Sequence, residues 1–349
     1  MPNFSKMVSK DNPVKVGIIL FALVIISLLS VSIRSYAFNG RPLTEVMKFR
    51  SSFIGTVPEL QSPMEMIVSD GCIVVYENQG SFKIYDTPSA DAADLRIPGP
   101  QTIATSKFVD VRSIIPLPDG FLFFDQDYTA NKVSYRGEHL SLEDISVNNL
   151  RGPLNGILPF KDGYLSLSPL FDCYNYHDCK TGKSTVFCRN PEWNDGVEDG
   201  SNYLFKSSSV VIHPGGGLVA VFYIFHDRII YYDSTGRVIK DVSLHLGGNQ
   251  DDRWPGTPSY YNSIVASNER LIVVSYGKYE YHFFDWNGNL RKRVRLDRVL
   301  FPMAYDFSSN SFYGIDRSES PMKMYSVRIG FESGNTVSYK AGASQIMKR

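Results

Sequence analysis

A unit of two short apolar stretches joined by a tight turn recurs six times between residues 63 and 330, and this repeat constrains the fold more than any other feature. The turn centres lie 41 to 53 residues apart along the chain, at Gly71, Gly120, Gly163, Gly216, Asn268 and Ser309. A hairpin of this size cannot bury its apolar face alone, so tandem copies must pack on one another. The repeat therefore predicts one closed array of similar sheets.

The residues of the turns and of the later strands define the unit further. Three of the turns are Asp-Gly pairs, which accept the positive φ angles of a two-residue hairpin, at Asp70–Gly71, Asp119–Gly120 and Asp162–Gly163. Two more strands follow in most copies, and the last alternates charged and apolar residues, as in 289–296, like an edge strand that faces water. Six units of four antiparallel strands predict an all-β, six-bladed β-propeller over residues 63–330. The alternative, a pair of β-sandwiches, leaves the regular spacing to coincidence.

The flanks of the repeat have separate expected roles. Residues 34–62 are interpreted as a linker, in which Thr44–Ile54 supplies an outer strand that closes the ring on the last blade. Residues 331–349 are polar and rich in Ser and Gly, and we expect this C-terminal tail to fray.

An uncharged apolar run precedes the repeat. Val16–Ile33 contains 18 residues without a charge, and a helix of that length reaches roughly the hydrocarbon thickness of a bilayer. We predict a transmembrane signal anchor at 16–33, a cytoplasmic N-terminus at 1–15, and a propeller on the periplasmic or extracellular side. A signal peptide cleaved after Ala37 is an alternative. A buried core helix is disfavoured because the run is apolar on all faces.

Charge and cysteine content limit the classes of partner. The 36 Lys and Arg residues balance 36 Asp and Glu residues, which argues against a dedicated nucleic-acid binder. Cys173 and Cys179 bracket a short segment and form a disulfide candidate if the domain lies in an oxidising compartment. Free structural thiols, or a metal site with His177, are the alternatives.

The stretch Leu271–Ile315 carries a resemblance to a known group. Its elements are the Phe-Asp-Trp-x-Gly turn at Phe284–Gly288, the basic strand that ends at Leu296–Arg298, and the segment Tyr313–Ile315. From about residue 40 to 330 the chain resembles the TolB-like six-bladed β-propeller proteins of Bacteroidetes. The resemblance implies a cell-envelope propeller and offers no catalytic motif. Members are often lipoproteins, whereas this chain has an apolar run with no lipidation Cys at its end.

Candidate binding residues follow from propeller geometry. The loops between second and third strands share one face with the connections that lead from one blade to the next, so functional residues are expected there. Two of these connections, 189–206 and 246–260, are long and combine Trp with carboxylates. The candidates for binding a ligand or partner are Arg112, Asp125, Asn155, Trp193, His226, Asp251, Arg253, Trp254, Tyr276 and Arg298. For the shorter candidates, a salt bridge between adjacent blades is the alternative reading.

The sequence contains no catalytic signature that we recognise. It has no Gly-x-Ser-x-Gly motif and no Gly-rich phosphate loop, and its six His residues are scattered. We therefore expect a non-enzymatic, membrane-anchored envelope module that binds a protein, peptide or glycan through its top-face loops, without a cofactor. The alternative is a hydrolase of lactones or esters in which carboxylates at the pore mouth hold Ca²⁺.

Overall fold

The protein is described from a computed structural model. The described residues are 45–78, 80–88, 101–104, 111, 113–125, 129–136, 139–144, 155–191, 207–251 and 254–329. All regular secondary structure within these ranges is β-strand. None of the described residues forms a helix able to cross a bilayer. The predicted anchor at 16–33 and the tail at 331–349 lie outside the description.

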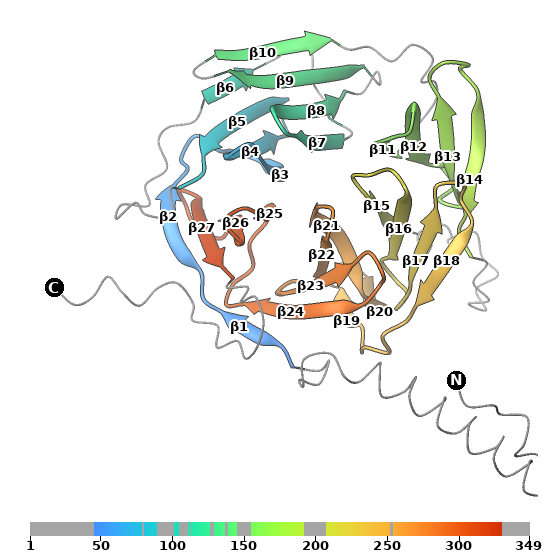
Figure 1. The fold of residues 1–349 in the computed structure, drawn as a ribbon. Helices are drawn as coiled ribbons and strands as arrows, with labels where there is room; N and C mark the ends of the chain where they lie inside the picture. Colours follow the sequence, from blue (N-terminus) through green and yellow to red (C-terminus); the bar gives the residue numbers. More distant parts are fainter. Residues whose placement is uncertain are drawn as a thin grey trace, which may run out of the picture. The chain divides into compact units, whose positions relative to one another are not determined.

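In the described residues the strands form six radial sheets around a common axis (Figure 1). The first three sheets, or blades, each run from an inner strand outward. Blade one contains β3 (Pro63–Ser69), β4 (Cys72–Glu77), β5 (Ser81–Asp86) and β6 (Gln101–Ala104). Blade two contains β7 (Ser113–Leu117), β8 (Gly120–Phe124), β9 (Ala130–Arg136) and β10 (His139–Asp144). Blade three contains β11 (Asn155–Phe160), β12 (Gly163–Leu167), β13 (Cys173–Asp178) and β14 (Ser184–Arg189).

The remaining blades follow the same order. Blade four contains β15 (Ser208–Ile212), β16 (Leu218–Tyr223), β17 (Ile229–Asp233) and β18 (Val238–Val242). Blade five contains β21 (Tyr261–Ser267), β22 (Leu271–Tyr276), β23 (Glu280–Asp285) and β24 (Leu290–Leu296), and blade six contains β25 (Met303–Asp306), β26 (Ser311–Asp316) and β27 (Lys323–Arg328). A small hairpin, β19 (Asn249–Asp251) and β20 (Trp254–Ser259), joins blades four and five. Each inner strand packs against the next, and β25 packs against β3, so the ring is closed. The predicted six-bladed propeller is confirmed, and the paired sandwiches are excluded.

Two short N-terminal strands close the ring, in a different way from the prediction. The predicted strand was Thr44–Ile54, on the last blade alone. In the structure β1 (Met47–Phe49) pairs in parallel with β24 of blade five, whereas β2 (Ser52–Thr56) pairs antiparallel with β27 of blade six. Between them the Ser51 amide donates to Asp297 Oδ1 at 3.0 Å, where the chain passes from one blade to the next. The split lets each short strand bury one large side chain, Phe49 or Ile54.

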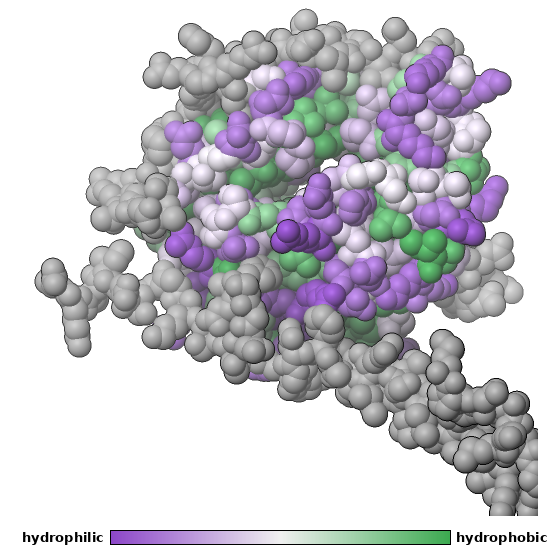
Figure 2. All heavy atoms as spheres, viewed as in Figure 1, coloured by the Kyte–Doolittle hydropathy of each residue, from purple (hydrophilic) through white to green (hydrophobic). Residues whose placement is uncertain are grey.

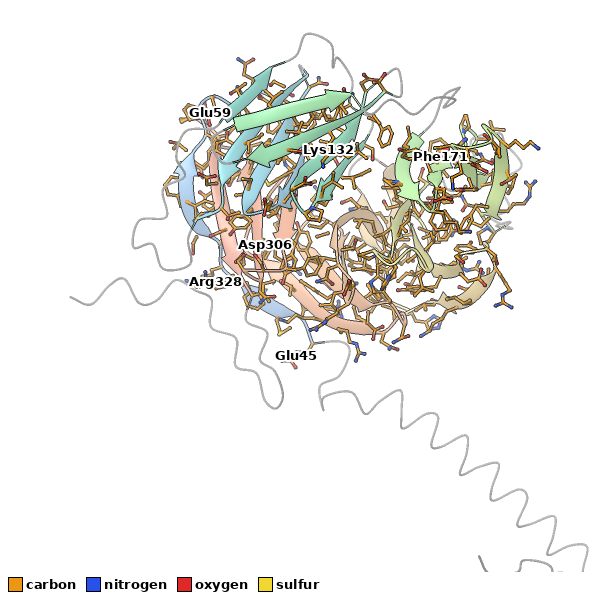
Figure 3. The ribbon with its side chains drawn as sticks, turned by 45° about the horizontal axis from the view of Figure 1, so that its top comes forward. Glu45, Glu59, Lys132, Phe171, Asp306 and Arg328 are labelled. Carbon is orange, nitrogen blue, oxygen red and sulfur yellow. The ribbon has the colours of Figure 1, made fainter. Side chains whose placement is uncertain are left out.

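The core lies between neighbouring blades, where side chains fill the space between the sheets (Figure 3). Between blades one and two, the Phe82 ring lies 5.0 Å from Phe121 and 4.8 Å from Phe123. Between blades four and five, the Phe222 ring lies 5.5 Å from Tyr261 and 5.6 Å from Phe284. The high aromatic content of the chain therefore serves mainly to pack blade on blade.

Hairpins form at all three Asp-Gly pairs, but only in the first is the pair itself the two-residue turn. At the first turn, Asp70 and Gly71 have φ of 46° and 73°, the left-handed pair that the sequence predicted. The next two turns are Pro118–Asp119 and Lys161–Asp162, and the glycine after each is the first residue of the following strand, where space requires it. A Cβ on Gly120 would overlap the carbonyl oxygen of Val133, and one on Gly163 that of His177. Both carbonyls belong to the third strand of the same blade, which therefore runs very close to these turns.

Candidate functional site

One side of the ring carries both the loops between second and third strands and the connections between blades, because the strands of each blade alternate in direction. We call this side the loop face and define it by residues 57–62, 168–172, 224–228, 243–248, 277–279, 297–302 and 317–322. The predicted binding residues were assigned to this side of the propeller. Arg112, Trp193 and Arg253 lie outside the described residues, and for Asn155, Asp251 and Trp254 only the backbone is described.

The other four predicted residues do not form one site. Asp125 accepts a hydrogen bond from the Thr129 amide at 2.9 Å and so braces its own loop in blade two. The Arg298 guanidinium pairs with Asp316 at 3.1 Å and lies 3.9 Å over the Tyr325 ring. Arg298 thus joins the connection after blade five to blade six. This is the alternative reading of the sequence, a salt bridge between adjacent blades. His226 and Tyr276 belong to adjacent blades, four and five.

Tyr276 belongs to a buried polar cluster between blades four and five. Its ring stacks on His282 at 4.3 Å, and its hydroxyl donates to the Gly247 carbonyl. His282 Nε2 lies 2.8 Å from Glu280 Oε1, and the same oxygen accepts a bond of 2.7 Å from Arg293. Burial lowers the pKa of His282, which favours the neutral imidazole. The pKa of Glu280 is lowered overall. Burial alone would raise it, but the hydrogen bonds from His282 and Arg293 stabilise the carboxylate and outweigh burial.

This cluster is sealed against a substrate. His282 is 0% exposed, and the Tyr261 ring closes the cluster 6.1 Å away. Several buried polar atoms in this region have no hydrogen-bond partner in the described part of the chain, including Tyr261 OH, His282 Nδ1 and Asp227 Oδ1. Buried atoms of this kind are ordinarily satisfied by internal water. We therefore assign the cluster a structural role in joining two blades.

The centre of the ring holds a channel, a cavity of about 1370 Å³. Figure 2 shows the hollow at the centre of the ring. The cavity is lined by side chains from the inner strands of all six blades and is mostly apolar. Representative lining residues are Met66, Ile114, Leu158, Val211, Ile264 and Tyr305. A cavity of this size, apolar with a few polar groups, is the usual form of a ligand-binding site.

Exposed apolar side chains border the channel where it reaches the loop face. Met64, Val299 and Phe301 all line the cavity and are 44%, 41% and 51% exposed. Arg317 lies 5.9 Å from the Phe301 ring, so a cation also stands at this rim. We call Met64, Val299 and Phe301 the apolar rim. Side chains of this kind around an opening are typical of recognition surfaces.

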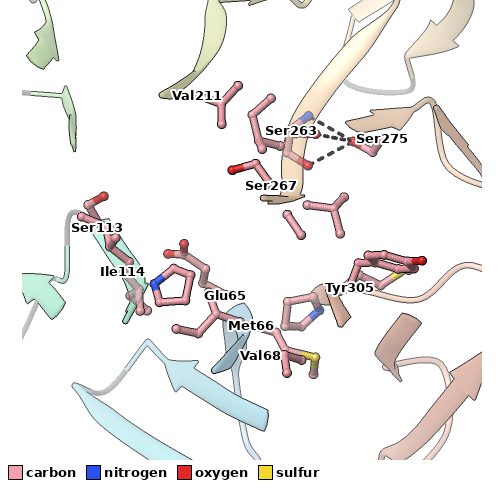
Figure 4. Close-up of a pocket in the computed structure, with 18 of the residues that line it drawn as sticks. Glu65, Met66, Val68, Ser113, Ile114, Val211, Ser263, Ser267, Ser275 and Tyr305 are labelled. Atoms are coloured by element: carbon pink, nitrogen blue, oxygen red, sulfur yellow. Dashed lines mark hydrogen bonds between the residues drawn. The ribbon is translucent and has the colours of Figure 1, made fainter. Parts of the chain in front are cut away.

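Glu65 is the carboxylate that the described part of the cavity wall presents to the channel. It projects from β3 into the cavity (Figure 4). No hydrogen bond or ion pair joins Glu65 to another described residue. Burial among apolar side chains raises the pKa of Glu65 to about 7, so this group changes charge near neutral pH.

Sequence reasoning missed both Glu65 and the apolar rim. A signal for Glu65 was present, because it is an acid in the middle of an inner strand that is otherwise apolar, MEMIVS at 64–69. The rim had no comparable signal. Val299 and Phe301 stand in a connection without hydrophobic periodicity, where nothing in the sequence says which side chains remain exposed.

The predicted disulfide between Cys173 and Cys179 is wrong. Both are free thiols, the alternative that the sequence left open, with Cys173 at the first residue of β13 and Cys179 directly after its last residue. Six residues of extended strand separate their Cα atoms by about 20 Å, whereas a disulfide needs about 7 Å or less. Among the described residues no three His, Cys, Asp or Glu side chains are grouped to hold a metal ion, and this applies to the thiols near His177.

Comparisons with known proteins add no function. No protein-family model matches the chain, and no curated protein matches it. Among solved structures, it is similar to Sqt1 of Saccharomyces cerevisiae, with 11% identity, 77% of this chain and 84% of that chain covered, and a TM-score of 0.45. It is also similar to the β-propeller domain of Cps50 (Swd1) from Myceliophteria thermophila, with 10% identity, coverage of 79% and 99%, and a TM-score of 0.45. At this level of similarity neither structure carries an argument about what this chain binds.

Proposed function

We propose that this protein is a membrane-anchored envelope propeller that binds a protein or peptide partner on its loop face, at the mouth of the channel. The observation that carries the proposal is the apolar rim, which exposes Met64, Val299 and Phe301 around an open cavity. Exposing three large apolar side chains costs solvation free energy, and a partner that covers them recovers it. The rim favours a polypeptide over a glycan because its exposed groups are apolar.

The location is proposed from the sequence. Residues 16–33 would hold the chain in a membrane, with the propeller in the periplasm or outside the cell. The resemblance of Leu271–Ile315 to TolB-like envelope propellers supports the same location. Changing Leu23 to Arg near the middle of the run, which costs roughly 3 kcal/mol in a bilayer, should increase the amount of full-length protein released by alkaline washing of membranes. Unchanged release would contradict the anchor.

The partner site is tested by photo-crosslinking of the full-length chain in its native membrane. Phe301 and Phe53 form a matched pair, since each is 51% exposed, but Phe53 lies on the outer strand β2. A crosslinking amino acid at position 301 should capture a discrete protein partner, and the same residue at 53 should not. Capture that is equal at both positions, or capture of glycan alone, contradicts the proposal. A Trp193→Ala/Trp254→Ala variant then tests whether the long connections contribute to capture.

The calcium-assisted hydrolase remains an untested alternative that no described residue favours. Its expected ligands are acidic residues of 189–206 and 246–260. Residues 192–206 lie outside the description, and so do the side chains of Asp251 and Asp252. Thermal unfolding in Ca²⁺ and in EDTA separates the alternatives. A site saturated about a hundredfold above its Kd stabilises the fold by about 2.7 kcal/mol, and an unchanged midpoint would argue against calcium.

A further inference from the structure

The interior of the channel combines an apolar wall with the carboxylate of Glu65, which has no hydrogen-bond or ion-pair partner among the described residues. The cavity reaches through the ring from the apolar rim, past inner-strand residues such as Met66 and Ile264. The acidic, basic and histidine side chains that line its described part are Glu65, Lys161, His213 and Lys278. Their surroundings decide which of them is available to a ligand.

The basic groups are already engaged. Lys161 Nζ lies 5.1 Å from the centre of the Phe160 ring and 5.8 Å from that of Tyr176. His213 Nδ1 accepts a hydrogen bond from the Gly215 amide at 2.9 Å, and its Nε2 lies 3.3 Å from the Glu269 carbonyl oxygen. Lys278 interacts with another group of the chain. The carboxylate of Glu65, in contrast, meets no donor among the described residues.

An ionised carboxylate in an apolar wall is unfavourable unless a cation or hydrogen-bond donors approach it. A ligand with a positive nitrogen would supply both, since an ammonium–carboxylate hydrogen bond is among the stronger ones. An apolar body on the same ligand would bury the wall of the channel at the same time. A neutral ligand could donate a hydrogen bond to Glu65 but would leave its charge uncompensated, and an anionic ligand would be repelled by it.

We propose that the channel binds an organic ammonium ion with an apolar body, whose nitrogen pairs with the Glu65 carboxylate. This site goes beyond the proposed partner binding, because it lies inside the channel and does not require the apolar rim to be covered. The cavity of about 1370 Å³ exceeds the usual range for small ligands, so it has room for such a molecule.

The test uses purified full-length protein in detergent and three probes that share one ring: cyclohexylammonium, cyclohexanol and cyclohexanecarboxylate. Ligand-observed NMR titrations measure the three dissociation constants. Cyclohexylammonium should bind at least about tenfold more tightly than cyclohexanol, as expected for one charge-assisted hydrogen bond. Cyclohexanecarboxylate should bind most weakly. Equal affinities for the amine and the alcohol would overturn the proposal.

Two variants assign the preference to Glu65. Glu65→Gln keeps the size of the side chain and should remove the preference for the amine, whereas Glu269→Gln changes an exposed acid in the same way and should leave it intact. A preference that survives in Glu65→Gln would also overturn the proposal. If that variant does not fold, Glu65→Asp retains the charge and should keep the order of the three probes, and loss of that order in folded Glu65→Asp would count against the site.

Acidification provides an independent readout. The amine, like the side chain of lysine, stays protonated between about pH 5 and 8, so loss of binding in that range reports on the protein. The preference should fall as the pH drops below about 7, where Glu65 takes up a proton. The strands packed against β3 are β4, β7 and β25, and their other titratable groups are Cys72, Tyr76, Glu77, Tyr305 and Asp306. The Glu65→Gln variant, which keeps all of these groups, should show no such fall. Crosslinking at Phe301 requires no amine, so the two proposals fail separately.

Discussion

Removing the charge of Glu65 should stabilise the fold, and by an amount that depends on pH. Burial raises the pKa of Glu65 from 4.5 to about 7 in the folded protein. Each pKa unit corresponds to about 1.4 kcal/mol, so holding the ionised carboxylate in the channel wall costs up to about 3 kcal/mol. The folded state binds this proton more tightly than the unfolded chain does. The stabilisation that comes from binding this proton is therefore complete below pH 4.5 and is lost as the pH rises through about 7.

Glu65→Gln keeps the shape of the side chain but does not titrate, so the comparison of the two proteins isolates this effect. At pH 8 the variant should have a larger free energy of unfolding by about 2–3 kcal/mol, and at pH 4 the two proteins should be equal. Urea unfolding at several pH values, followed by tryptophan fluorescence, measures the difference. Glu269→Gln, an exposed change of the same kind, should shift neither value. A difference that is the same at both pH values would refute the reasoning, because it would not come from ionisation.

Three further changes test the packing of the blades. Burial lowers the pKa of Lys292 from 10.5 to about 7, so the folded state binds this proton more weakly than the unfolded chain does, and stability falls as the pH drops from 10.5 through 7. Lys292→Met should therefore raise the thermal midpoint at pH 6, and a lower midpoint would contradict this. Ile54, on the closing strand, is 2% exposed, and Ile54→Ala should lower the free energy of unfolding in urea by about 2–4 kcal/mol, whereas a loss below about 0.5 would mean that β2 contributes little. Trp286 Nε1 donates to the Asn268 carbonyl at 2.8 Å, and Trp286→Phe should cost about 1–3 kcal/mol in the same assay unless water replaces the bond.

The repeat could be predicted because its signals are local. Asp70–Gly71 forms a hairpin from the conformational preference of those two residues alone. The glycines of the next two turns show the limit of this reasoning. Gly120 and Gly163 are needed because a third strand passes close to each turn, and that strand comes many residues later. The sequence identified the right residue for the wrong physical reason.

The candidate site could not be predicted from local signals. A strand pattern tells which residues share a face, but on an inner strand it does not tell which face meets the channel, so Glu65 received no role. Phe301 belongs to a connection whose exposure depends on how blades five and six pack. Where the N-terminal segment divides into β1 and β2, the Ser51 amide donates to Asp297, a residue from a distant part of the sequence. Each of these features is a property of the closed ring.

The location of β2 also sets an order of events during synthesis. The ribosome produces Ser52–Thr56 before any blade, but its partner β27 is made last. Until then, the edge of β2 has no native neighbour and must be kept from pairing with other chains. The ring therefore gains its final stability only after β27 has been made, and a polypeptide truncated before Lys323 should leave both free edges open to aggregation and proteolysis.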